Sequence, residues 1–114
     1  MPLKPRDLII DNWGREGIVV EQVKRPAAGW LDDQRDSRMR ALPWDTIWWS
    51  VLCVRGGSVN VPELLTRFVR EATIDDVMTA IEYANEHARR TIAQLFPEAV
   101  ERALQHGQKG KNVV

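Results

Sequence analysis

The sequence predicts an α+β domain, in which a curled antiparallel sheet is followed by two or three helices. Two observations lead to this fold class. β-Branched and aromatic runs with turn signals fill the first half of the chain, and amphipathic helical periodicity fills the second half. At 114 residues, the chain has the usual size of a single domain. We therefore expect a β half over residues 7–61, a helical half over residues 62–106 and a frayed tail over residues 107–114.

The strongest strand signal lies at residues 47–54, where the side chains are apolar on both faces. Such a strand is usually covered on both faces. The turn residues at 55–58 then lead into a return strand over residues 59–61, which predicts a β-hairpin. Trp48 and Trp49 are neighbours in this strand and must face opposite sides of the sheet.

A second β signal lies upstream. Residues 7–11 have the apolar content of a short strand or a single turn. Gly14 and Gly17 permit a tight turn with positive φ, and residues 18–23 follow as a strand. Residues 30–42 carry charges of both signs, so the simplest interpretation is a long hydrophilic loop, with a short helix as the alternative.

The segment from Trp13 to Val23 has turn glycines followed by Ile18-Val19-Val20. In this it resembles the glycine-and-valine motif of KOW-type small barrels, which have an SH3-like fold. The resemblance implies that strongly bent strands close a five-stranded barrel. It also implies nucleic acid as the usual partner of the family. The helical half lies outside the resemblance.

The helical half begins, by its pattern, at Pro62, because proline suits the first position of a helix. Residues 64–69 then carry an apolar stripe with helical spacing. Apolar residues keep helical period from Ile74 to Leu95, which predicts one helix of about six turns. We expect a last short helix over residues 98–106.

Thr73 is the predicted N-cap of the long helix. Asp76 follows three residues later, in a near match to the capping box. Ile81 lies at the centre of the apolar stripe of this helix, so we expect its side chain to be buried against the sheet.

The charge and cysteine content bear on the class of function. The 16 basic and 16 acidic residues give a net charge of zero, which disfavours a dedicated nucleic-acid binder. The single cysteine, Cys53, fits a reducing compartment. The first ten residues lack the apolar core of a signal peptide, and no apolar run approaches membrane-spanning length. We therefore expect a cytoplasmic protein without a membrane partner.

All five tryptophans lie in the β half, and two of them are candidate binding residues. Trp30 and Trp44 flank the polar loop, and tryptophan is enriched at interface hot spots. The loop arginines are the candidates for contact with a phosphate backbone. Neighbouring aspartates nearly cancel their charge, so the alternative is a solvated loop of mixed charge. These arginines are Arg35, Arg38 and Arg40.

No residue pattern predicts a catalytic site, a metal site or a cofactor. The loop aspartates lack the glycine and the terminal glutamate of a calcium loop. A thiol nucleophile needs a base within hydrogen-bond reach, and Cys53 lies in an apolar run where an inert core role is expected. His87 fits the boundary of a wet helix face, and His106 fits the last turn of a helix.

We therefore expect a small non-catalytic binding module whose partner is another protein or a second copy of the chain. The first alternative is a nucleic-acid-binding small barrel. The second alternative is an enzyme with a pocket between the sheet and the helices.

Overall fold

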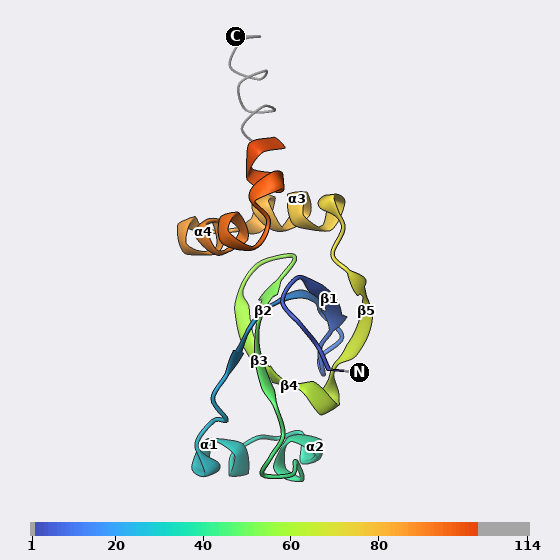
Figure 1. The fold of residues 1–114 in the computed structure, drawn as a ribbon. Helices are drawn as coiled ribbons and strands as arrows, with labels where there is room; N and C mark the ends of the chain where they lie inside the picture. Colours follow the sequence, from blue (N-terminus) through green and yellow to red (C-terminus); the bar gives the residue numbers. More distant parts are fainter. Residues whose placement is uncertain (1, 103–114) are drawn as a thin grey trace.

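The computed structural model describes residues 2–102, which form a five-stranded antiparallel sheet with helices at both of its ends (Figure 1). The strands are β1 (Asp7–Ile10), β2 (Glu16–Val23), β3 (Trp48–Cys53), β4 (Ser58–Pro62) and β5 (Arg67–Glu71). The helices are α1 (Ala28–Asp32), α2 (Ser37–Arg40), α3 (Ile74–Tyr83) and α4 (Glu86–Leu95), with a 3-10 turn at Glu63–Leu65. The α+β class and the order of sheet before C-terminal helices are confirmed.

The sheet has the strand order β4-β3-β2-β1-β5, and every neighbouring pair is antiparallel. Ile18 of β2 lies opposite Leu8 of β1 on one side and Leu52 of β3 on the other. The sheet curls strongly (Figure 1), but within residues 2–102 no ladder joins β4 to β5. The closed barrel that the KOW resemblance implied is therefore corrected to an open, curled sheet.

The predicted β3–β4 hairpin is confirmed. Its turn places Gly56 and Gly57 at φ values of 109° and 87°, which only glycine adopts easily. Gly14 also has positive φ, at 81°, in the turn between β1 and β2. Gly17 serves a different purpose: a Cβ atom there would overlap the side chain of Val51 on the adjacent strand.

The helical half was predicted to begin too early. Pro62 is the last residue of β4, and residues 67–71 form β5 instead of continuing a helix. The apolar pattern at 64–69 mimics a helical stripe, yet Leu64 and Phe68 are both exposed. Pairing with the free edge of β1 outweighs this local pattern, and Phe68-Val69 suits a strand. The boundary between the two halves therefore lies near Ala72.

The single long helix predicted over residues 74–95 is wrong, because the chain breaks into α3 and α4 at Ala84-Asn85. Ala84 is extended (ψ 137°), and the Asn85 side chain accepts a hydrogen bond from the Ala88 N–H at 2.8 Å, which caps α4. The break lets both helices cover the same end of the sheet (Figure 1).

The predicted cap of α3 is confirmed. Thr73 Oγ1 accepts from the Asp76 N–H at 3.3 Å, and the Asp76 carboxylate accepts from the Thr73 N–H at 2.8 Å, which completes a capping box. Residues 97–102 are helical, as the start of the predicted last helix. The remainder of that helix, His106 and the tail over residues 107–114 lie outside the described residues.

The polar stretch over residues 30–42 is not a plain loop, because α1 and α2 occupy much of it. Asp36 caps α2 by accepting from the Arg38 N–H at 2.9 Å. Leu31 and Met39 are buried and pack against Trp48 of β3. This α1–α2 insert therefore covers Trp48, at the opposite end of the sheet from the C-terminal helices (Figure 1).

The core consists of three clusters of buried side chains. The largest joins the sheet to the C-terminal helices: Leu8, Ile18, Leu52, Val54, Val77, Ala80, Ala88, Ile92, Phe96 and Ala99. The second fills the inside of the curled sheet: Leu3, Ile9, Val19, Trp49, Val51 and Val61. The third lies under the insert: Leu31, Met39 and Trp48. Trp48 and Trp49 face opposite sides, as expected, and both are buried.

Candidate functional site

Three of the five tryptophans are exposed. Trp13, Trp30 and Trp44 expose 53%, 45% and 83% of their surface, whereas Trp48 and Trp49 are buried. Trp30 lies on α1, Trp44 on the segment after α2, and Trp13 in the turn between β1 and β2. Exposed indoles are costly in water, and where they gather they mark surfaces that bind.

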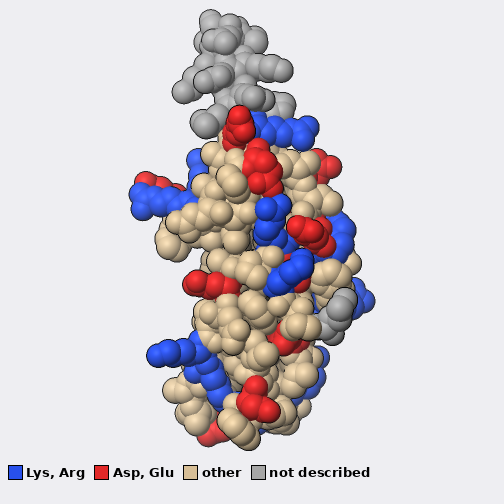
Figure 2. Space-filling view, viewed as in Figure 1, with Lys and Arg blue, Asp and Glu red and all other residues tan. Residues whose placement is uncertain are grey.

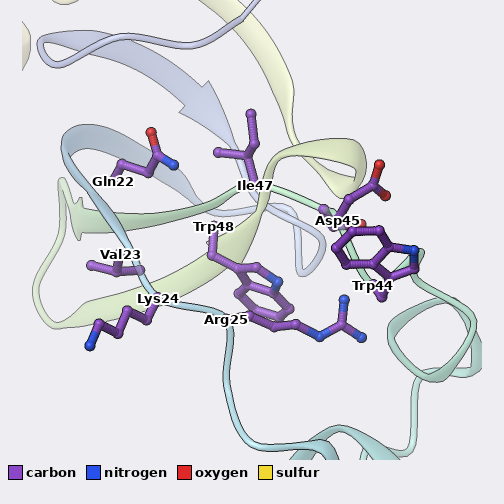
Figure 3. Close-up of a pocket in the computed structure, with 9 residues that line it drawn as sticks. Gln22, Val23, Lys24, Arg25, Trp44, Asp45, Ile47 and Trp48 are labelled. Carbon is purple, nitrogen blue, oxygen red and sulfur yellow. The ribbon is translucent and has the colours of Figure 1, made fainter.

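Trp44 lines an open hollow of about 500 Å³ at the insert end of the sheet. In Figure 3, Trp44 and Asp45 lie on one side of this hollow and Val23 and Lys24 on the other. Trp48 contributes to the lining between them. The full lining is Gln22, Val23, Lys24, Arg25, Trp44, Asp45, Thr46, Ile47 and Trp48.

A second hollow, of about 550 Å³, is lined by both Trp13 and Trp30. Lys24 lines both hollows, so the two share a cationic side chain. The Trp30 ring meets the Trp48 ring edge to face, with centroids 6.3 Å apart and planes at 76°. The remaining lining residues are Pro26, Ala27, Val59 and Asn60. We call the two hollows and their three exposed indoles the tryptophan surface.

Local hydrogen bonds hold the tryptophan surface in place. Arg25 Nη1 donates to the Pro43 carbonyl at 2.6 Å, which ties the end of β2 to the segment carrying Trp44. Arg38 Nη2 donates to the Asn12 carbonyl at 3.4 Å, which ties α2 to the turn carrying Trp13. The insert is therefore anchored to two other segments of the chain.

The three predicted arginines line neither hollow. Arg38 forms an ion pair with Asp36 at 2.8 Å, and the side-chain hydrogen bond from Arg38 lowers the pKa of Asp36. Arg40 Nη1 donates to the Gln34 carbonyl at 2.9 Å, and Arg35 is exposed in the segment between α1 and α2. Arg38 and Arg40 thus form contacts that stabilise the insert itself.

Sequence reasoning did not single out Trp13 or Lys24 as site residues. A usable signal existed for Trp13, because the turn glycine Gly14 directly follows it, and a turn tip cannot bury a large side chain easily. No sequence signal pointed to Lys24. Its role depends on the way in which β2 and the insert meet.

A smaller hollow, of about 250 Å³, lies between the sheet and the C-terminal helices. Cys53 and His87 both line it. Burial raises the pKa of the Cys53 thiol, which keeps it in the poorly nucleophilic protonated form at neutral pH. This geometry does not supply an activated thiol.

Within the described part of the chain, no three side chains of the His, Cys, Asp and Glu types gather as a metal site. Among residues 2–102, no helix is long and apolar enough to cross a bilayer. Basic and acidic side chains are interspersed over the face seen in Figure 2, without a continuous basic patch. The tryptophan surface therefore offers exposed aromatic side chains and a cationic side chain, Lys24, that lines both hollows.

No protein-family model matches the chain, and searches of the curated proteins and of the solved structures found no match.

Proposed function

We propose that this chain is a small non-catalytic binding module that holds a segment of another protein at the tryptophan surface. The observation that carries the proposal is the gathering of three exposed indoles around two hollows that share Lys24 in their linings. Tryptophan gives large contact area at low cost in conformational entropy and is enriched in interface hot spots. The proposal keeps the predicted cytoplasmic location.

The lining chemistry favours a peptide as ligand. The hollows combine apolar and aromatic side chains with Lys24, and the first hollow also has Arg25 and Asp45 in its lining. Lys24 is a donor that suits carbonyl and carboxylate oxygens. The buried Trp48 N–H has no acceptor within the described residues, so an unsatisfied donor lies beside the first hollow. A peptide carbonyl could accept from it once the surrounding side chains shift.

Nucleic acid stays the alternative ligand, because bases stack on exposed indoles. Two observations weigh against it. The net charge is zero, and Arg25, Arg38 and Arg40 donate to acceptors within the chain. Few counterions would therefore be released on binding a phosphate backbone.

The test compares wild type, the Trp30→Ala/Trp44→Ala double variant and Tyr83→Ala. Tyr83 is a matched control because it is an aromatic residue on α3 with 53% exposure, away from both hollows. Thermal melting first establishes that all three chains fold. The probe is a random-peptide display library selected on wild type, followed by titration of the selected peptides.

We expect the selected peptides to bind Tyr83→Ala as tightly as wild type, and to bind the double variant about tenfold or more weakly, as for hot-spot residues. Equal binding to the folded double variant would place the ligand elsewhere. If no peptide is selected and a single-stranded oligonucleotide binds with strong salt dependence, the nucleic-acid alternative replaces the proposal.

A further inference from the structure

The strand β4 forms one free edge of the sheet. It pairs with β3, and among residues 2–102 no strand is hydrogen-bonded to its other side. Its ladder with β3 is regular, because the Cα partners run from Trp48↔Pro62 to Leu52↔Ser58 without a register shift. An edge strand presents unpaired backbone N–H and C=O groups, to which another extended segment can bind.

The backbone groups that point outward from β4 belong to its even-numbered residues. At the two ends of the β3–β4 ladder, the Cys53 N–H donates to the Gly57 carbonyl at 2.8 Å, and the Glu63 N–H donates to the Ile47 carbonyl at 2.9 Å. Hydrogen-bonded and non-hydrogen-bonded pairs alternate in an antiparallel ladder, so the odd-numbered residues of β4 bond to β3. The even-numbered residues therefore direct their N–H and C=O groups away from β3.

Ser58 and Asn60 form the accessible part of this edge. Both residues are exposed, and within residues 2–102 no backbone–backbone hydrogen bond from another segment reaches either of them. Pro62, the next even-numbered residue, is buried and has no N–H to donate. An added strand can therefore bond to the N–H and C=O groups of Ser58 and Asn60, and the ladder ends before Pro62.

The side chain of Asn60 connects this edge to the second hollow. Asn60 lies on the same face of the sheet as Trp48, which the insert covers, and Leu52, which packs against the C-terminal helices. It lines the second hollow together with Trp13 and Trp30. Opposite residues of neighbouring strands project to the same face, so a residue added opposite Asn60 would project to the face of this hollow.

We propose that an extended peptide segment of another protein adds to β4 as a further strand and places an apolar side chain, opposite Asn60, in the hollow lined by Trp13 and Trp30. The inference rests on the proposed function and specifies how the peptide is held. Backbone bonds to Ser58 and Asn60 give affinity without regard to the sequence of the peptide. The two indoles select a large apolar side chain at one position.

Lys24 adds a preference for a carboxylate near that apolar side chain. Among the described residues that line the second hollow, Lys24 alone is charged. Lys24 is exposed and forms no ion pair with any residue in the range 2–102. Glu21 lies opposite Ser50 on the same face but does not line the hollow. We therefore expect the bound peptides to carry Asp or Glu close to the apolar residue.

A second copy of β4 fits this edge less well than a peptide does. The residues of β4 that share the face of the hollow are Ser58, Asn60 and Pro62. Ser58 and Asn60 are polar, and Pro62 lacks the N–H that a ladder needs. No residue of β4 therefore offers both a large apolar side chain on this face and a complete pair of backbone bonds.

The first experiment is an N-methyl scan of the peptides that display selection on wild type yields. Each backbone nitrogen is methylated in turn, which removes one N–H, and the affinity is measured by titration. We expect losses of about tenfold or more at alternate positions and little change between them, because every second N–H of an added strand faces β4. A scan without this alternation would overturn the proposal.

The second experiment removes a single donor from the protein. Asn60→Pro and Asn60→Ala both lack the side-chain amide, but Asn60→Pro also lacks the N–H that faces the peptide. Thermal melting first establishes that both variants fold. We expect the peptides to bind Asn60→Pro about tenfold more weakly than Asn60→Ala. Equal affinities for the two folded variants would overturn the pairing with β4, and the N-methyl scan decides the question if Asn60→Pro does not fold.

The third experiment exchanges the charges. We expect Lys24→Glu to weaken the binding of an acidic peptide by about tenfold, and replacement of the acidic residue of the peptide by lysine to restore its affinity for this variant. Arg89→Glu makes the same charge change at an exposed site on α4 and should leave the affinity as in wild type. Equal binding of the acidic peptide to Lys24→Glu and wild type would contradict the preference for a carboxylate.

The outcomes separate this inference from the function on which it rests. Peptides that bind Trp30→Ala/Trp44→Ala more weakly but show no alternation would leave the proposed function in place and overturn the strand addition. Peptides that show the alternation but bind the double variant as tightly as wild type would support the edge and overturn the tryptophan surface. Sedimentation equilibrium of wild type and Asn60→Pro tests the other occupant: a dimer that only wild type forms would replace the peptide by a second copy.

Discussion

At the scale of single residues, Arg6 adds polar and cation–π contacts between the two halves of the molecule. Its guanidinium lies 4.6 Å from the centroid of Phe96, and Nη2 donates to Glu98 at 2.7 Å. Its φ of 80° is unusual for a residue other than glycine. The Arg6 N–H donates to the Val19 carbonyl and the Arg6 carbonyl accepts from the Ala72 N–H, both at 2.9 Å, which fixes the backbone on either side of this φ. No sequence pattern could indicate this role, because Phe96 and Glu98 lie far along the chain.

We expect Arg6→Ala to lower the free energy of unfolding by about 1–2 kcal/mol, through loss of a cation–π contact and a partly exposed ion pair. Guanidinium denaturation measures the change. Arg89→Ala is the control, since Arg89 is exposed on α4 and forms no ion pair within residues 2–102. Equal stabilities for the two variants would show that Arg6 does not link the halves.

Cys53 gives a prediction about pH. Burial raises the pKa of its thiol, so the folded chain keeps the proton to higher pH than the unfolded chain does. The stability that this group contributes is therefore complete below about pH 8.5, the ordinary thiol pKa, and is lost as the pH rises through the folded pKa.

The measurement is the urea midpoint of wild type and of Cys53→Ala at several pH values from neutral to alkaline. Wild type should lose stability more steeply than the variant in the alkaline range, because only wild type releases this proton on unfolding. Other titrating groups affect both chains alike and cancel in the comparison. Parallel curves would mean that the thiol is no harder to ionise in the folded chain.

At the scale of elements, the sequence predicted what local chemistry determines. The Gly56-Gly57 hairpin and the Thr73 cap depend on residues close together in the chain, and both are confirmed. The strand β5 forms by pairing with the free edge of β1, and local periodicity cannot indicate a pairing between such distant residues. The break at Asn85 was hidden because apolar spacing continues across it.

For the candidate site too, features set by neighbouring residues could be predicted from the sequence and features set by distant residues could not. The exposure of Trp30 and Trp44 was inferred from the polar residues between them, which is local information. The first hollow forms where the end of β2 meets the segment that leads into β3, and the second where the residues after β2 meet α1, β4 and the turn at Trp13. Because these segments are distant in the sequence, Lys24 could not be identified from it. The two-residue alternation in strand β3 did predict that Trp48 and Trp49 face opposite sides.

The break between α3 and α4 also changes which residue is central to helix packing. Ile81 was expected at the buried centre, yet it is only partly buried, whereas Ile92 on α4 is 1% exposed. We expect Ile92→Ala to cost about 3 kcal/mol and Ile81→Ala roughly half of that, because the loss scales with the buried surface and the cavity left behind. Chemical denaturation of the two variants measures both costs, and the reverse order would contradict this packing.

At the scale of the whole molecule, the question is whether sheet and helices unfold as one unit. The largest core cluster contains side chains from both: Leu8 and Leu52 pack with Ile92 and Phe96. Neither half can bury these surfaces alone, so we expect one cooperative transition. The chain offers two independent probes, because all five tryptophans lie in the sheet half and the insert, whereas α3 and α4 dominate the helical signal.

Tryptophan fluorescence therefore follows the sheet half, chiefly through the buried Trp48 and Trp49, and far-ultraviolet circular dichroism follows the helices. In a denaturant titration, we expect the two transitions to coincide in midpoint and slope. Ile92→Ala provides the control, since it removes a contact from the helical side and must shift both transitions equally if they are coupled. A fluorescence transition that stays in place while the dichroism transition moves would show that the sheet holds its structure without the helices, and that the chain consists of two units.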